Sequence, residues 1–210
     1  MNMDSIKSTA DLLITINMLY DMLKGKFDFD PDGWSIFQSD HFLDEWPEDM
    51  VTYANRNSGL IVDRNRTLLC HFARDTQNYA RFPKVMDDIP VYREYMGAVF
   101  PDITVTWDMD IEMQESILLA NQLYAAVLAV YGVRLVANTR CGSKSSQRCF
   151  RHIPRNVTCA SGFLGCPIAS NIGETAAYIN KILLLRPDKL IIYGKEDPAV
   201  TEQSQVQICV

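Results

Sequence analysis

The sequence predicts an α/β fold with a mainly parallel sheet of about five strands, arranged as an open sheet or a partial barrel with crossover helices. Short apolar or β-branched runs begin near residues 68, 103, 133, 157 and 189. Successive starts are 24 to 35 residues apart, which is room for a strand, a helix and two loops. Helix-type segments lie between several of these runs. This alternation is typical of parallel α/β proteins.

The N-terminal part is predicted to be a helical, acidic extension of this fold. Between Ser5 and Leu23 apolar residues recur at helical spacing, and Gly25 is a suitable stop. The helix can pack on its own domain or on a second subunit. Residues 1–50 hold 11 acidic and 3 basic residues, so this end of the chain is strongly negative.

The first half of the α/β region contains two expected strands and three expected helices. Leu68–Phe72 is a short apolar run with polar flanks, and residues 103–107 read I-T-V-T-W, rich in β-branched residues. Between them, two short helices are expected, broken around Pro83 and Pro90. Ile111–Tyr131 is the clearest helix because it lacks Gly and Pro and is rich in Leu, Ala, Met, Gln and Glu.

The second half supplies three further strands. They are expected at Val133–Ala137, Val157–Ala160 and Lys189–Tyr193. A helix from Asn171 to Leu185 precedes the last of them, with a capping-box-like start. The connection Gly142–Asn156 is short and basic, so no full amphipathic helix is expected in it.

Length and composition indicate one main domain. We assign residues 1–60 to the N-terminal extension, 61–200 to the α/β domain and 201–210 to a mobile tail. No apolar run is long enough to cross a bilayer, and the N-terminus resembles neither a signal nor a transit peptide. We therefore expect a cytoplasmic protein with no membrane partner and with reduced cysteines.

Charge is unevenly distributed along the chain. Residues 116–173 contain six of the 20 Lys and Arg residues and none of the 26 Asp and Glu residues. Such a separation can concentrate positive potential in one region and favours an anionic ligand. The overall charge of −6 argues against general nucleic-acid binding by the whole surface.

The carboxyl ends of parallel strands are where α/β proteins bind ligands, and polar, basic and glycine residues follow the expected strands here. Backbone N–H groups in such turns can hold phosphate or carboxylate oxygens. The predicted ligand-binding residues are Arg74, Asn138, Thr139, Arg140, Ser161, Gly162, Gly165 and Lys195.

A metal site is a second possibility at the same edge. Asp75, Asp108 and Asp110 could hold Mg²⁺ against a phosphorylated substrate, although Asp110 is equally suited to cap a helix and Asp108 to be solvated. Cys166 could serve as a nucleophile near a helix start, but no base lies near it in the sequence. The cysteine spacings match no zinc module, so no cofactor is assigned.

Four segments resemble an uncharacterised phage and prophage domain family. They are P-D-I-T-V-T-W-D-M-D at 101–110, Y-G-V-R-L-V-A-N-T-R at 131–140, C-A-S-G-F-L-G-C at 159–166 and L-R-P-D-K-L-I-I-Y-G at 185–194. The resemblance covers roughly residues 68–195, with Ala137 in place of the usual proline. It implies a phage protein in the host cytoplasm and an α/β domain, and it assigns no catalytic residue.

Three functions are compatible with these patterns. The first is binding of a nucleotide or another phosphorylated small molecule, which a phage could use to sequester a host defence signal. The second is a metal-dependent enzyme acting on a phosphorylated substrate. The third is a host-protein inhibitor that uses the acidic N-terminal surface. A homo-oligomer is compatible with each of them.

Overall fold

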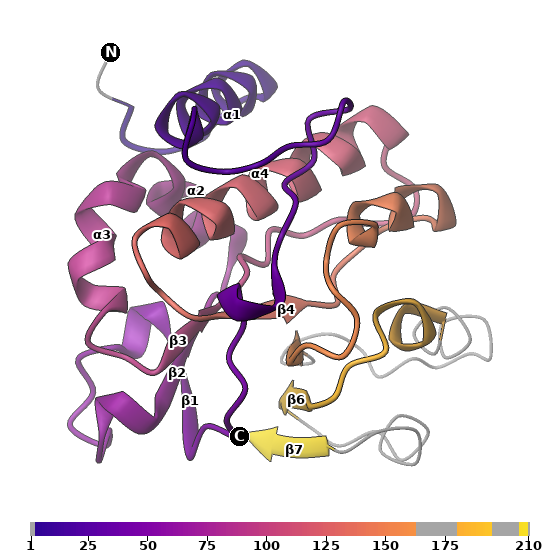
Figure 1. The fold of residues 1–210 in the computed structure, drawn as a ribbon. Helices are drawn as coiled ribbons and strands as arrows, with labels where there is room; N and C mark the ends of the chain where they lie inside the picture. Colours follow the sequence, from indigo (N-terminus) through magenta and orange to yellow (C-terminus); the bar gives the residue numbers. More distant parts are fainter. Residues whose placement is uncertain (1–2, 163–179, 195–205, 210) are drawn as a thin grey trace.

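The computed structural model describes residues 3–162, 180–194 and 206–209, the last four by their backbone alone. Its centre is an all-parallel sheet of seven strands in sequence order, of which β1–β6 have described side chains (Figure 1). The sheet is nearly barrel-shaped. The strands are β1 (Asp49–Thr52), β2 (Thr67–Cys70), β3 (Gly97–Val99), β4 (Leu135–Asn138), β5 (Cys159–Gly162), β6 (Leu190–Tyr193) and β7 (Val206–Cys209).

The α/β class and the parallel sheet are confirmed, but the expected number of about five strands is too low. β1 lies inside the first 60 residues and pairs with β2. β7 lies inside residues 201–210, expected to be a mobile tail, and pairs with β6. Both strands have only four residues and polar side chains within them, so hydrophobic patterning gave little sign of them.

The strand expected at residues 103–107 is wrong, because the strand of this region is β3, six residues earlier. Ile103 and Val105 are buried without taking part in the sheet, so their alternation reflects packing rather than strand pairing. Gly97 lies so close to the next strand that a Cβ atom there would be 2.6 Å from the Arg134 carbonyl oxygen. In the sequence a glycine at this position suggests a turn. In the structure it allows the backbone of β3 to lie close to the backbone just before β4.

Helices cover the outer face of the sheet. They are α1 (Thr9–Leu23), α2 (Asp75–Arg81), α3 (Val85–Tyr92) and α4 (Ile111–Val130). α4 agrees with the prediction, and Asp110 caps it by accepting a hydrogen bond from the Glu112 N–H. Pro90 lies inside α3 rather than ending it. The connection between β4 and β5 holds only the 3-10 helix η5 (Lys144–Phe150), as expected.

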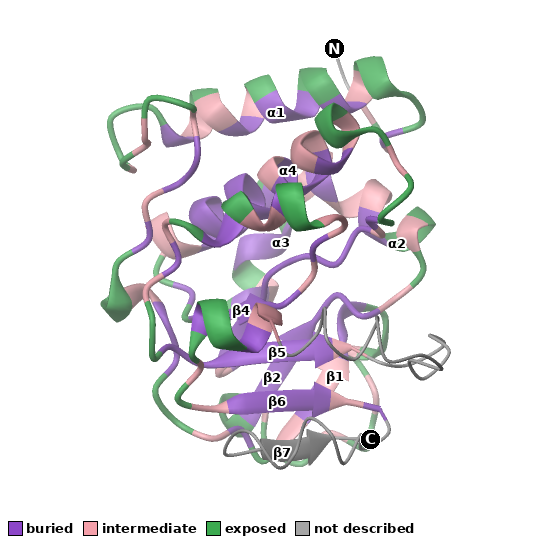
Figure 2. Cartoon of the chain, turned by 90° about the vertical axis from the view of Figure 1, so that its right-hand side faces the viewer, coloured by how far each residue is buried: buried purple, intermediate pink, exposed green. Residues whose placement is uncertain are grey.

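The helix predicted between residues 171 and 185 is helical at 180–185, and its start lies outside the described residues. α1 packs on α4 and forms the outermost layer, and its outer face is exposed in Figure 2. No helix in the described ranges is long and apolar enough to cross a membrane.

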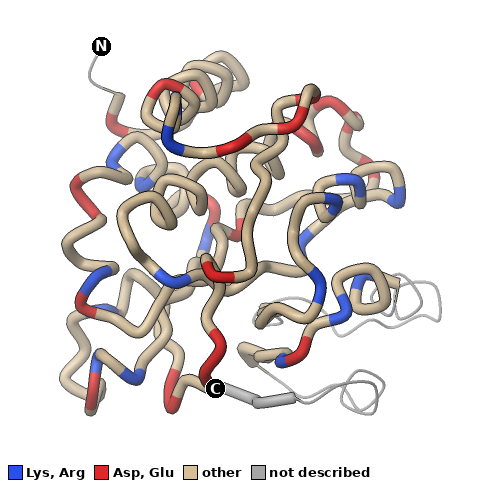
Figure 3. Tube along the Cα trace, viewed as in Figure 1, with Lys and Arg blue, Asp and Glu red and all other residues tan. Residues whose placement is uncertain are grey.

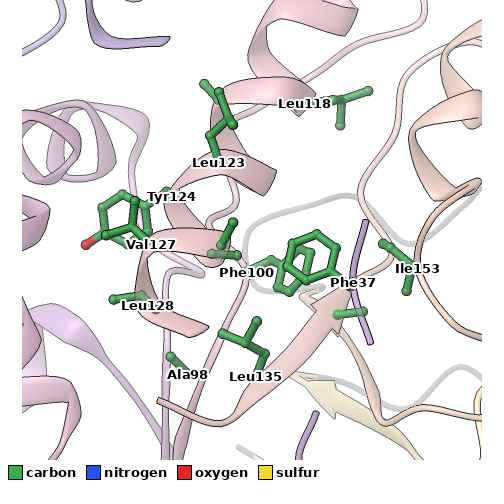
Figure 4. Packing of buried hydrophobic residues seen from close by; sticks show 14 of the residues in the cluster. Phe37, Ala98, Phe100, Leu118, Leu123, Tyr124, Val127, Leu128, Leu135 and Ile153 are labelled. Atoms are coloured by element: carbon green, nitrogen blue, oxygen red, sulfur yellow. The ribbon is translucent and has the colours of Figure 1, made fainter. Parts of the chain in front are cut away.

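Strand side chains are buried on both faces of the sheet, as parallel sheets require. One set packs against one another on the side away from the helices: Met50, Leu68, Cys70, Val99, Val136, Ala160 and Ile191. The alternate residues, such as Ala98 and Leu135, pack beneath α4 and beside Phe37 and Phe100, whose ring centroids are 5.0 Å apart (Figure 4). This double burial fixes the strands, and with them the position of the loops at their carboxyl ends.

Candidate functional site

A pocket of about 570 Å³ lies at the carboxyl ends of the parallel strands. Residues that end or follow β1, β2, β3, β4 and β5 all contribute to it, and we call it the rim pocket. It is lined by Thr52, Ala54, Asn55, Phe72, Ala73, Arg74, Gln77, Asp102, Thr104, Arg140 and Gly162. Its place agrees with the edge at which a site was expected, and three of the predicted ligand-binding residues line it.

Arg140 is held in the rim pocket by a buried carboxylate. Its Nε and Nη2 donate to the two oxygens of Asp102 at 2.7 and 2.8 Å, a bidentate pair. The Asn138 side chain donates to the same carboxylate at 2.8 Å and accepts from the Arg140 backbone N–H at 2.9 Å. Asp102 is 7% exposed. The pair therefore fixes the guanidinium and balances its charge.

Arg74 differs from Arg140 in that no described carboxylate forms an ion pair with it. It is exposed where β2 leads into α2. Arg74, Asp102 and Arg140 are the charged residues among the described lining, which gives the pocket a net positive charge.

Several predicted ligand-binding residues have structural roles, and two lie outside the described residues. Thr139 and Ser161 are buried, and the Thr139 N–H donates to the Ala160 carbonyl, so it is not open to an anion. A Cβ atom at Gly162 would lie 2.5 Å from the Phe72 ring, so close packing against this ring requires a glycine at this position. Gly165 and Lys195 lie outside the described residues.

The structure does not bring Asp75, Asp108 and Asp110 together as a metal site. Asp75 accepts hydrogen bonds from the Thr104 N–H and hydroxyl at 3.0 and 3.1 Å, and Asp110 caps α4. Asp108 is exposed, and a hydrogen bond from the Thr106 side chain lowers the pKa of its carboxyl group. No group of three His, Cys, Asp or Glu side chains in the described ranges could hold a metal ion.

The acid-poor stretch 116–173 does not form one basic rim, because acidic residues from elsewhere meet it. Arg148 of η5 pairs with Glu115 of α4, and Arg151 lies 3.7 Å from Asp32 of the N-terminal segment. Arg134 lies just before β4, at the opposite edge of the sheet from the rim pocket. Red and blue positions are accordingly mixed over the chain in Figure 3.

Acidic residues of the N-terminal segment also lie beside basic residues from the second half of the chain. His152 Nε2 lies 2.7 Å from the Asp30 carboxylate, and Lys189 lies 3.2 Å from that of Asp44. Burial raises the pKa of Asp30, but hydrogen bonds from the Trp34 N–H and His152 outweigh it and hold the pKa below its usual value. Opposite charges that are far apart in the sequence are therefore neighbours in the fold.

A second, smaller pocket of about 230 Å³ adjoins the rim pocket on the side of β1 and α2. Beneath it lies His71, the residue after β2, whose Nδ1 is 3.2 Å from the side-chain Oδ1 of Asn78. The Asn78 side-chain Nδ2 donates to the main-chain carbonyls of His71 and Asp102, so Oδ1 is the acceptor for Nδ1–H of His71. His71 Nε2 then accepts from the Tyr92 hydroxyl, which in turn pairs with Tyr124. Burial lowers the pKa of His71 to about 4.

The residues that sequence reasoning missed are Asp102, Thr104 and those after β1. Because a strand was expected at 103–107, the carboxyl end of that strand was expected at Trp107 rather than near Asp102. Trp107 is 79% exposed and lines neither pocket. The P-D dipeptide at 101–102 was visible in the sequence, and a correct β3 would have put Asp102 on the rim.

Comparisons with known proteins give no further guide to this site. No family model, curated protein or solved structure matches the chain. The assignment of a function therefore depends on the pockets and their chemistry.

Proposed function

We propose that the chain binds a small anionic molecule of nucleotide size in the rim pocket. The observation that carries this proposal is Arg74, an arginine without an ion pair in the described ranges, beside a pocket of about 570 Å³. Ligand pockets commonly measure about 300–1,000 Å³. An arginine fork suits phosphate and carboxylate oxygens, since it can donate two parallel hydrogen bonds.

The rest of the lining suits the uncharged part of such a ligand. Thr52, Asn55, Gln77 and Thr104 offer hydroxyl and amide groups, which can bind sugar hydroxyls or base edges. Arg140 is preorganised by Asp102 and can donate to the ligand from a fixed position at little entropic cost.

Among the described residues, the side-chain chemistry favours binding without turnover, and Cys166 lies outside them. The carboxylate in the described lining, Asp102, already accepts from Arg140 and Asn138. Both ring nitrogens of His71 have partners. Burial raises the pKa of the Cys159 thiol to about 12, so it is a poor nucleophile at neutral pH. The phage setting and the sequestering of a host defence signal stay predictions from sequence.

The test is a titration of the full chain with AMP, ADP, ATP and inorganic phosphate by isothermal titration calorimetry. The same mixtures are then analysed by ion-exchange chromatography. We expect binding of at least one nucleotide, weakened at high salt, with the nucleotide recovered unchanged. Conversion to a product would favour an enzyme, and absence of binding by the whole panel at millimolar concentration would overturn the proposal.

A further inference from the structure

The second pocket and the rim pocket adjoin, and we call them the two lobes of one site. Ala54, Ala73 and Gln77 line both pockets, so these three residues lie at the boundary between the lobes, which we call the neck. Two of the three are alanines, and the third is uncharged. The second lobe extends the site across the end of β1 toward Arg56 and Arg81.

Arg56 is the residue of the second lobe that can take an anion. Its Nη1 donates to the Tyr53 carbonyl at 2.9 Å, and its guanidinium lies 4.4 Å from the centre of the Tyr53 ring. It forms no ion pair in the part of the chain that the structure describes. Because a guanidinium has five N–H donors, a carbonyl contact leaves capacity for a ligand.

The Tyr53 ring, on which the Arg56 guanidinium lies, is held in place by buried neighbours. The Tyr53 hydroxyl donates to Asp88 at 2.7 Å, and its ring is parallel to that of His71 at 5.9 Å between centroids. Asp88 is buried and lies 2.8 Å from Arg81 Nε. Asp88, Arg81 and His71 do not line the rim pocket, and through these contacts they hold the Tyr53 ring in position beneath Arg56.

The two lobes repeat one arrangement. In each lobe an arginine is paired with a buried aspartate, Arg140 with Asp102 and Arg81 with Asp88. Each lobe also has an arginine that lacks an ion pair in the described ranges, Arg74 in the rim pocket and Arg56 in the second pocket. Two cationic positions, one on each side of the uncharged neck, are therefore available to one ligand.

We infer that the ligand carries two anionic groups on an uncharged body, as a nucleoside bisphosphate does, with one group on Arg74 and the other on Arg56. This inference rests on the proposed function of the rim pocket. It adds the second lobe and a preference for doubly substituted ligands.

The test compares adenosine 3′,5′-bisphosphate with 5′-AMP by calorimetry on the full chain. We expect the bisphosphate to bind at least 10-fold more tightly. Arg56→Ala should remove this preference and leave the affinity for AMP within twofold, while Arg74→Ala should weaken both ligands. Arg155→Ala removes the same charge at an exposed position that lines neither lobe, and it should change neither affinity.

A second variant tests the neck directly. Ala54 is exposed, so Ala54→Leu is expected to fold, which its thermal unfolding checks, and to weaken the bisphosphate more than AMP. Equal affinities of the wild-type chain for the two ligands, or an equal loss of both in Arg56→Ala, would overturn the inference and leave the proposed function standing. Binding of neither probe would overturn the inference, and binding of no member of the nucleotide panel would overturn the proposed function as well.

Discussion

The ion pair between Arg140 and Asp102 should contribute measurably to stability. The two side chains are 23% and 8% exposed and meet at two hydrogen-bonded contacts. Two unit charges about 4 Å apart attract by about 4 kcal/mol at an effective dielectric constant near 20. Desolvation offsets roughly half of this for a partly buried pair, so we expect a coupling free energy of about 2 kcal/mol.

The perturbation is a double-mutant cycle with Arg140→Ala, Asp102→Asn and the double variant. Arg140→Ala leaves a buried carboxylate for which Asn138 is the remaining side-chain donor among the described residues, and should lower the free energy of unfolding by about 3 kcal/mol. Asp102→Asn leaves a partly exposed guanidinium, so its cost should be smaller, about 2 kcal/mol. The double variant should cost about 3 kcal/mol, well below the total of the two single changes.

Urea unfolding followed by circular dichroism measures each free energy. Arg64 and Glu94 are a suitable control pair because their side chains are 41% and 52% exposed. Their coupling should be no more than about 0.5 kcal/mol. If the coupling of Arg140 with Asp102 were as small as that of the control pair, Asp102 would not hold the Arg140 guanidinium in a fixed position in the rim pocket.

Two further predictions concern the fold that carries the two lobes. The pKa of His71 is about 4 in the folded chain and about 6.5 in the unfolded chain, so the unfolded state binds more protons between these values. The free energy of unfolding should therefore fall by about 2 kcal/mol from pH 7 to pH 5, and the fall should be smaller by that amount in His71→Gln. Gly97→Ala places a Cβ atom 2.6 Å from a main-chain oxygen of the neighbouring strand and should cost about 2–3 kcal/mol in urea unfolding. Gly59→Ala, where no atom lies within 4 Å, should be close to neutral, and equal costs at both glycines would contradict the packing argument.

Much of the fold was predictable because local patterns and burial agree there. β2, β4, β5 and β6 were found within two residues at their starts, and α4 was found with its cap. Each is a short apolar run or a long run of strong helix formers between clear breaks. β3 was missed because Gly97 weakens the local signal, while the buried pair Ile103 and Val105 imitates a strand outside the sheet.

The edge of the sheet at which the candidate pocket lies was predictable, but its chemistry was not. The carboxyl edge of a parallel sheet is a general binding place, and Arg74, Arg140 and Gly162, which were expected there, line one pocket; their binding of a ligand stays a prediction. The sequence does not show which acidic residue lies beside each basic residue in the fold. The stretch without acids suggested free positive charge, yet Asp102 from another loop is paired with Arg140. Arg56 was overlooked because it follows a strand that was itself not predicted.

The affinity of Arg74→Ala for the tightest nucleotide of the panel, compared with that of Arg155→Ala, tests the central claim most directly. Both variants remove one positive charge from an exposed position, but only Arg74 lines the rim pocket. We predict at least a 10-fold loss of affinity in Arg74→Ala and less than a twofold change in Arg155→Ala. Equal affinities in the two variants would mean that the anion is not bound in this pocket.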